Sequence, residues 1–188
     1  DHVGGLWWVQ QNSGARVLTS PQALEVIESG EADAADPQSG MHDPMHPIAR
    51  HLVSAIEPGE VVTLLGRDFL PVATPGHTPG ALTWQWQDCE GSECLSVVYA
   101  DSLSAVSSDH YRFSDHPDYV QAYRDGLARL AALDCDVLLT PHPSASHMRD
   151  KLLAGDLAGG MTCAAYAADR LARLETRLEQ EAQGGIGQ

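Results

Sequence analysis

The sequence predicts an α/β protein with mixed sheets. Two pairs of strand-like runs are each joined by a short turn, which indicates antiparallel hairpins. A long amphipathic helix then leads directly into another strand-like run, and a second long helix follows it. Hairpins combined with strand–helix alternation are typical of the α/β class with mixed sheets. The predicted strands are residues 61–65 with 69–74, 81–87 with 95–100, and 136–140.

The first 47 residues are predicted to form two short helices, one strand and a long loop. A helix from Val3 to Gln11 ends at Asn12-Ser13-Gly14, and residues 15–19 form the strand. Ser20 caps a helix over residues 21–29, whose first residue is a proline. Residues 30–47 are polar and rich in Asp, Pro, Gly and His. A loop of that length in a compact domain is usually functional or mobile.

Two longer helices carry regular apolar stripes. A helix over residues 118–133, preceded by Pro117, has its apolar residues at helical spacing, and so does a last helix over 161–182. Each therefore buries one face and leaves the other in water. The stripes are Val120, Tyr123, Leu127, Leu130 and Leu133 in the first helix, and Tyr166, Leu171, Leu174 and Leu178 in the last.

Length and charge limit the classes of function. With 188 residues, 43% of them hydrophobic, the chain is predicted to be a single domain over residues 1–188. The net charge of −15, with only 11 Lys and Arg, argues against a nucleic-acid partner. No apolar run approaches the roughly 20 residues of a membrane-spanning helix, so a membrane partner is not expected.

The four cysteines are an even number, which suits two disulfides and an oxidising compartment. Three pairings are possible, and we favour Cys89–Cys94 at a hairpin tip and Cys135–Cys163 between a strand and the last helix. A zinc–thiolate site fits the spacings poorly, and free buried thiols are the other alternative.

Three histidines lie in turns that are suited to metal binding. His77 stands within Thr74-Pro75-Gly76-His77-Thr78-Pro79-Gly80, and His142 lies between Pro141 and Pro143. Both turns follow apolar runs, and Pro and Gly stiffen them so that the imidazole is held still. His2, beside Asp1, is the third candidate. The other six histidines lack such a setting and are interpreted as surface or loop residues: His42, His46, His51, His110, His116 and His147.

Taken in order, these motifs resemble the metallo-β-lactamase superfamily, and most closely the class B β-lactamases of subclass 3. The Gly-His-Thr-Pro-Gly turn marks only the superfamily. The Ala-Asp-Ser-Leu-Ser and Thr-Pro-His-Pro segments narrow the resemblance to subclass 3. The matching segments are Asp1-His2 with Gly4-Gly5, Thr74 to Gly80, Tyr99-Ala100-Asp101-Ser102-Leu103-Ser104, Arg112-Phe113-Ser114-Asp115-His116-Pro117, and Asp134 to Pro143.

The resemblance implies an αβ/βα sandwich and a two-zinc site. The family motif is His-x-His-x-Asp-His, and this chain begins at its Asp-His, so we expect an N-terminally incomplete domain. Asp1, His2 and His142 would bind one zinc, and His77 would bind the other. Hydroxide held by the metals would attack the β-lactam carbonyl, and Asp1 would orient the hydroxide.

Ser102 and Ser104 would meet the substrate carboxylate, although capping of the loop by their hydroxyl groups is an alternative. In superfamily relatives such as glyoxalase II, an aspartate near the position of Asp101 bridges the metals. In subclass 3 it does not, and we follow that interpretation for Asp101. The implied protein is a monomeric, periplasmic or secreted enzyme of antibiotic resistance. A lactone or thioester hydrolase and an inactive zinc-binding fragment are the alternatives. A serine nucleophile is disfavoured because no Gly-x-Ser-x-Gly or Ser-x-x-Lys motif is present.

Overall fold

The computed structural model describes residues 2–184 and contains two sheets. A small parallel sheet pairs β1 (Val17–Thr19) with β2 (Val53–Ala55). The larger sheet has five strands in the order β3-β4-β5-β6-β7, antiparallel from β3 to β6 and parallel between β6 and β7. The predicted α/β class with mixed sheets is confirmed. The bounds are β3 Val62–Leu64, β4 Arg67–Ala73, β5 Leu82–Glu90, β6 Glu93–Tyr99 and β7 Val137–Leu139.

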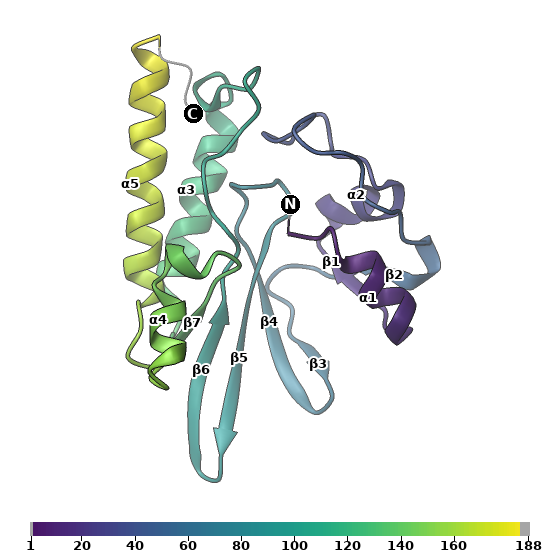
Figure 1. Cartoon of the computed structure of the whole chain (residues 1–188), viewed down its shortest axis with the longest axis vertical. Helices are drawn as coiled ribbons and strands as arrows, with labels where there is room; N and C mark the ends of the chain where they lie inside the picture. Colours follow the sequence, from purple (N-terminus) through teal and green to yellow (C-terminus); the bar gives the residue numbers. More distant parts are fainter. Residues whose placement is uncertain (1, 185–188) are drawn as a thin grey trace.

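The helices stand in two groups on either side of the larger sheet (Figure 1). The long helices α3 and α5 run side by side along one side of it, and α1 and α2 accompany the small sheet on the other. Within residues 2–184 no helix is both long enough and apolar enough to cross a membrane. The α-helix bounds are α1 Leu6–Ser13, α2 Leu24–Ser29, α3 Pro117–Ala131, α4 Met148–Leu153 and α5 Cys163–Ala182.

Each group of helices has its own core. The larger core joins α3 and α5 to β6 and β7, and Tyr123, Leu130, Tyr166 and Leu174 are fully buried in it. The smaller core packs α2 against β1 and β2 through Val17, Ile27, Ile48 and Val53. The predicted stripes are therefore confirmed at their central positions, although Leu171 stays exposed on α5.

Several boundaries differ from the prediction for local reasons. Helix α1 begins at Leu6 and not at Val3, because Gly4 and Gly5 form a turn and glycine is a poor helix former. The β3–β4 turn is Leu65-Gly66, since both residues have positive φ (52° and 77°) and β4 already begins at Arg67. Strand β2 and helix α4 were not predicted.

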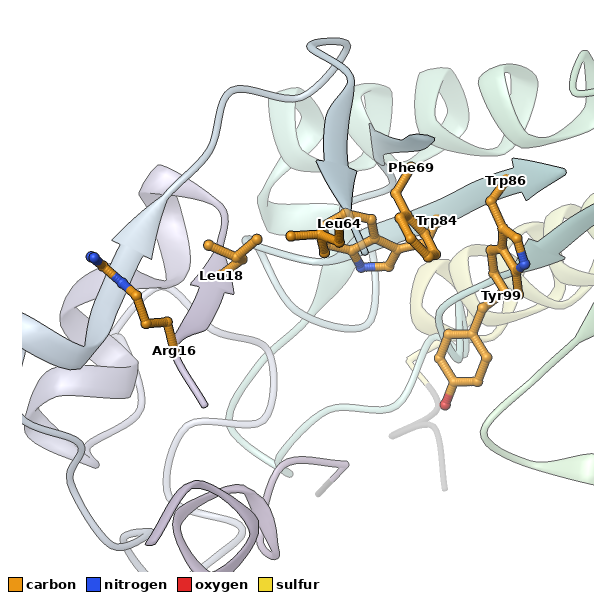
Figure 2. A pocket seen from close by; sticks show the side chains of 7 residues that line it. All are labelled: Arg16, Leu18, Leu64, Phe69, Trp84, Trp86 and Tyr99. Carbon is orange, nitrogen blue, oxygen red and sulfur yellow. The ribbon is translucent and has the colours of Figure 1, made fainter. Parts of the chain in front are cut away.

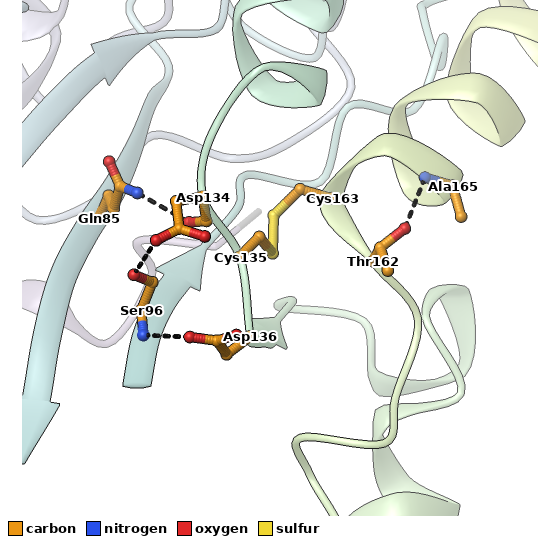
Figure 3. Close-up of a disulfide and its surroundings, with 8 residues drawn as sticks. All are labelled: Gln85, Ser96, Asp134, Cys135, Asp136, Thr162, Cys163 and Ala165. Atoms are coloured by element: carbon orange, nitrogen blue, oxygen red, sulfur yellow. Dashed lines mark hydrogen bonds between the residues drawn. A yellow bond between two sulfur atoms is a disulfide. The ribbon is translucent and has the colours of Figure 1, made fainter. Parts of the chain in front are cut away.

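Both favoured disulfides are present. Cys89 and Cys94 face each other across the tip of the β5–β6 hairpin. Cys135 joins the start of β7 to Cys163, the first residue of α5 (Figure 3). Beside it, Ser96 donates its Oγ–H to Asp134 and its backbone N–H to Asp136, which fixes β7 against β6.

One side of the larger sheet carries an apolar groove of about 650 Å³. Its aromatic side chains point into a shared hollow opposite Arg16 and Leu18 of the β1 segment (Figure 2). The groove is lined by Arg16, Leu18, Leu64, Phe69, Trp84, Trp86 and Tyr99.

Candidate metal centre

The three histidine-bearing turns meet at one place, as the sequence predicted. His77 follows β4, His142 follows β7, and His2 precedes α1. The ring centroid of His2 lies 5.2 Å from that of His77 and 4.7 Å from that of His142. Residues that are 140 positions apart in the chain therefore present their imidazoles to a common space.

The glycines around His77 are required by close packing. A Cβ at Gly76 would lie 2.5 Å from ring carbons of Tyr123, and a Cβ at Gly80 would lie 2.6 Å from the Cβ of Ala23. The Tyr119 hydroxyl donates to the Gly76 carbonyl at 3.1 Å. Ser20, the cap of the following 3₁₀ turn, donates its hydroxyl to the Gly80 carbonyl at 2.7 Å. The turn is thus clamped from both sides.

The His77 side chain is buried, with 3% of its surface exposed, and is oriented by its neighbours. Its Nδ1 lies 3.1 Å from the hydroxyl and 3.2 Å from the carbonyl of Ser104. Nδ1–H donation to that carbonyl selects the tautomer in which Nε2 carries the lone pair that a metal needs. Gln38, from the long loop, donates its side-chain amide to the His77 carbonyl at 3.0 Å.

Ser102 and Ser104 form a layer behind His77. Ser102 is buried, and its hydroxyl lies 2.9 Å from that of Ser104, which in turn reaches His77. These contacts resemble the capping alternative more than an open substrate site. Binding of a substrate carboxylate by the two serines stays a prediction.

His142 is held through its backbone. The Thr140 hydroxyl donates to the His142 carbonyl at 3.1 Å and lies 2.7 Å from the hydroxyl of Ser146. Thr140 and Ser146 are both buried, so the turn after β7 is held from the protein interior. His142 itself stays exposed.

The electrostatics of the cluster favour the neutral form of His2. Burial, followed by the neighbouring His77, lowers the pKa of His2 to about 4, although Asp101 acts in the opposite direction. Burial also raises the pKa of Asp101, against the influence of His77 and of the Ser102 N–H. A neutral imidazole is the form that coordinates a metal ion, so His2 is available as a ligand at neutral pH.

His2, His77 and Asp101 line a cavity of about 320 Å³, and so does Pro141, the residue before His142. The walls come from β1, the start of α2, the turn after His77, and the aromatic side chains of Trp84 and Tyr99. Asp33 and Asp36 of the long loop complete the lining.

The donor set fits a divalent metal. Imidazoles and carboxylates are the ligands of catalytic zinc, and Oδ2 of Asp101 is buried without a hydrogen bond from any described residue. As the side chains stand, no group of three or more His, Cys, Asp or Glu among residues 2–184 is arranged as a complete metal site. Asp1, predicted as a ligand and as the catalytic carboxylate, lies outside the described residues. His2, His77 and His142 are brought together, and their ligand roles remain predictions.

Sequence reasoning missed the contribution of the long loop. Gln38 and Asp36 come close to His77 only through packing, and Asp36 has its pKa raised by burial. The one available signal was the length of the loop. The six other histidines stay outside the cavity lining, and two of them contact aromatic rings, His46 beside Trp7 and His116 stacked on Tyr111.

The fold and the histidine cluster define an α/β protein with a candidate metal site built from loops at strand ends. Comparison with known proteins agrees: the profile of the metallo-beta-lactamase superfamily matches residues 1–90. The metallo-beta-lactamase MIM-1 from Novosphingobium pentaromativorans is 39% identical with a TM-score of 0.88, and the match covers 96% of this chain and 66% of that one.

Two further solved structures are similar over the same extent. MEM-A1, a subclass B3 enzyme from a soil metagenome, is 35% identical with a TM-score of 0.88. SMB-1, bound to 2-mercaptoethanesulfonate, is 38% identical with the same TM-score. Each match covers 96% of this chain and 71% of the solved one. The chain therefore belongs to the metallo-beta-lactamase superfamily, among its subclass B3 members, and spans about two thirds of the length of the relatives it matches.

Proposed function

We propose that this chain serves in the zinc-dependent hydrolysis of the β-lactam amide bond. The observation that supports it most is the meeting of the His2, His77 and His142 rings, of which His2 and His77 line one cavity together with Asp101. The solved relatives are named as β-lactamases, and SMB-1 holds a small thiol-bearing molecule. Membership of the superfamily implies a divalent metal. We propose that two zinc ions bind at this site.

His2 and His142 would hold one ion and His77 the other, with Asp1 completing the first set. Zinc bound there supplies a Lewis acid that activates water near neutral pH. The chain contributes orientation, because Ser104 fixes the tautomer of His77 and Gln38 fixes its backbone. Asp1 is proposed to orient the attacking water and to take up its proton.

The two disulfides support a periplasmic or secreted location, where oxidised cysteines persist. A role in antibiotic resistance follows if the activity is present in such a compartment. We propose a monomeric protein, which sedimentation would test directly.

The test is turnover of nitrocefin with added zinc, followed by removal of zinc with EDTA. We expect turnover that EDTA abolishes and that His142→Ala lowers at least a hundredfold. Hydrolysis of a lactone or thioester without any β-lactam turnover would contradict the proposal and support another hydrolase of the superfamily. Zinc stoichiometry by mass spectrometry addresses the inactive-fragment alternative, since one ion or fewer per chain, without turnover, would support it.

A further inference from the structure

The walls of the histidine cavity are negatively charged. Three carboxylates line it, those of Asp33, Asp36 and Asp101, and no Lys or Arg of residues 2–184 does. The remaining lining is mostly apolar, with Trp84 and Tyr99 as its largest side chains. Asp33 and Asp36 therefore add negative charge beside the proposed metal site, and no Lys or Arg in the described part of the lining offsets it.

The two loop carboxylates are fixed in place. Oδ1 of Asp33 accepts the N–H of Ala35 at 2.7 Å, and Oδ1 of Asp36 accepts the N–H of Gln38 at 2.8 Å. In each case the second carboxylate oxygen takes no part in that turn. Neither residue forms an ion pair with a Lys or Arg within residues 2–184.

The loop that carries these residues is itself attached to the site. Ser108 donates its N–H to the Pro37 carbonyl at 2.8 Å, and Gln38 reaches the His77 carbonyl. These two bonds attach the residues directly after Asp36 to the His77 turn and to the segment at Ser108. Asp101, which also lines the cavity and lies near His2 and His77, has a buried Oδ2 without a hydrogen-bond partner among the described residues. A buried carboxylate oxygen of this kind is suited to a cationic or hydrogen-bond-donating ligand.

We propose that Asp33 and Asp36 make the site selective for substrates that carry a positively charged substituent. This inference rests on the proposed function and narrows it to β-lactams with an ammonium or pyridinium group. The net charge of −15 extends the same field beyond the cavity and attracts such molecules during approach. Two carboxylates at partly exposed positions favour the cation by up to about tenfold at low ionic strength, and salt weakens the effect.

Cephaloridine and cephalothin are matched probes because they share one acyl side chain and differ at C3. Cephaloridine has a pyridinium group there and cephalothin an acetoxy group. We expect the kcat/KM ratio of cephaloridine to cephalothin to fall three- to tenfold in the double variant Asp33→Asn, Asp36→Asn. Asparagine keeps the acceptor oxygen of each turn, so the loop conformation is retained. Asp43→Asn is the control, since Asp43 is exposed in the same loop and outside the cavity lining.

Binding provides a second measurement that does not need turnover. Trp84 lines the cavity, so its fluorescence reports the binding of each compound in the presence of EDTA. We expect tighter binding of cephaloridine, lost in the double variant and reduced by 0.5 M NaCl. An unchanged preference in the double variant, or an equal loss in Asp43→Asn, would overturn the inference. Failure of the proposed function has a different signature: neither compound is hydrolysed by any variant, whatever the binding preference.

Discussion

Replacing Glu181 by glutamine should strongly destabilise the protein, although the residue is far from the cavity. Glu181 is 2% exposed near the end of α5. Its carboxylate accepts the N–H groups of Phe113 and Ser114 at 3.2 Å and 2.8 Å, and Nε–H of Arg177 at 2.6 Å. Arg177 is also buried and donates to the Ser107 hydroxyl at 2.8 Å. The pair thus attaches the segment that follows Ser104 to the last helix.

Glutamine has the same shape but no charge. It would leave the buried Arg177 guanidinium without a counter-charge, and its amide NH₂ would face N–H donors. Breaking one partner of a buried ion pair costs about 3–5 kcal/mol, which corresponds to a fall in Tm of roughly 6–20 °C for a domain of this size.

The measurement is urea and thermal unfolding at pH 7 with the disulfides intact. Glu179→Gln is the matched control, because Glu179 is exposed two residues away on the same helix; its effect should stay within about 0.5 kcal/mol. A loss below about 1 kcal/mol in Glu181→Gln, or a loss equal to that of the control, would refute the reasoning.

Three other predictions concern the disulfides, the histidine support and acid stability. Removing Cys135–Cys163, which spans 28 residues, should lower the free energy of unfolding by about 3–4 kcal/mol in the chain-entropy model. Removing Cys89–Cys94, which spans 5, should lower it by about 2 kcal/mol. Chemical unfolding of the paired Cys→Ser variants measures both losses, and equal losses would contradict the model. Ser104→Ala should weaken zinc binding about tenfold, at the lower end of such effects because the Ser104 carbonyl still engages His77; unchanged affinity by calorimetry would contradict this role. Although burial opposes its ionisation, the bonds from Ser114 and Arg177 leave the pKa of Glu181 below its ordinary value of 4.5, so unfolding free energy should fall as pH drops below 4.5 and the acid limb should flatten in Glu181→Gln. An identical acid limb in both proteins would contradict it.

The sequence was most informative where local chemistry determines the structure. Pro and Gly on both sides of His77, and Pro on both sides of His142, predicted rigid turns after strands, and those turns do meet. The hairpins and the amphipathic helices were also predictable, since each depends on a local pattern. The disulfide partners followed from where the predicted elements place Cys135 and Cys163.

Long-range packing explains what was missed. Strand β2 has three residues and is stabilised by parallel pairing with β1, from Val17↔Val53 to Thr19↔Ala55, which leaves no local signal. Helix α4 is six residues long and begins after His147, whose φ of 55° marks a tight turn. Gln38 and Asp36 reach the site through the fold of an irregular loop, and periodicity gives no information on such a loop.

The apolar groove and the histidine cavity have three lining residues in common, Leu18, Trp84 and Tyr99. The two hollows therefore lie next to each other, and these side chains belong to the walls of both. An apolar compound bound in the groove would contact the Trp84 and Tyr99 rings, which also line the histidine cavity, without touching a candidate metal ligand.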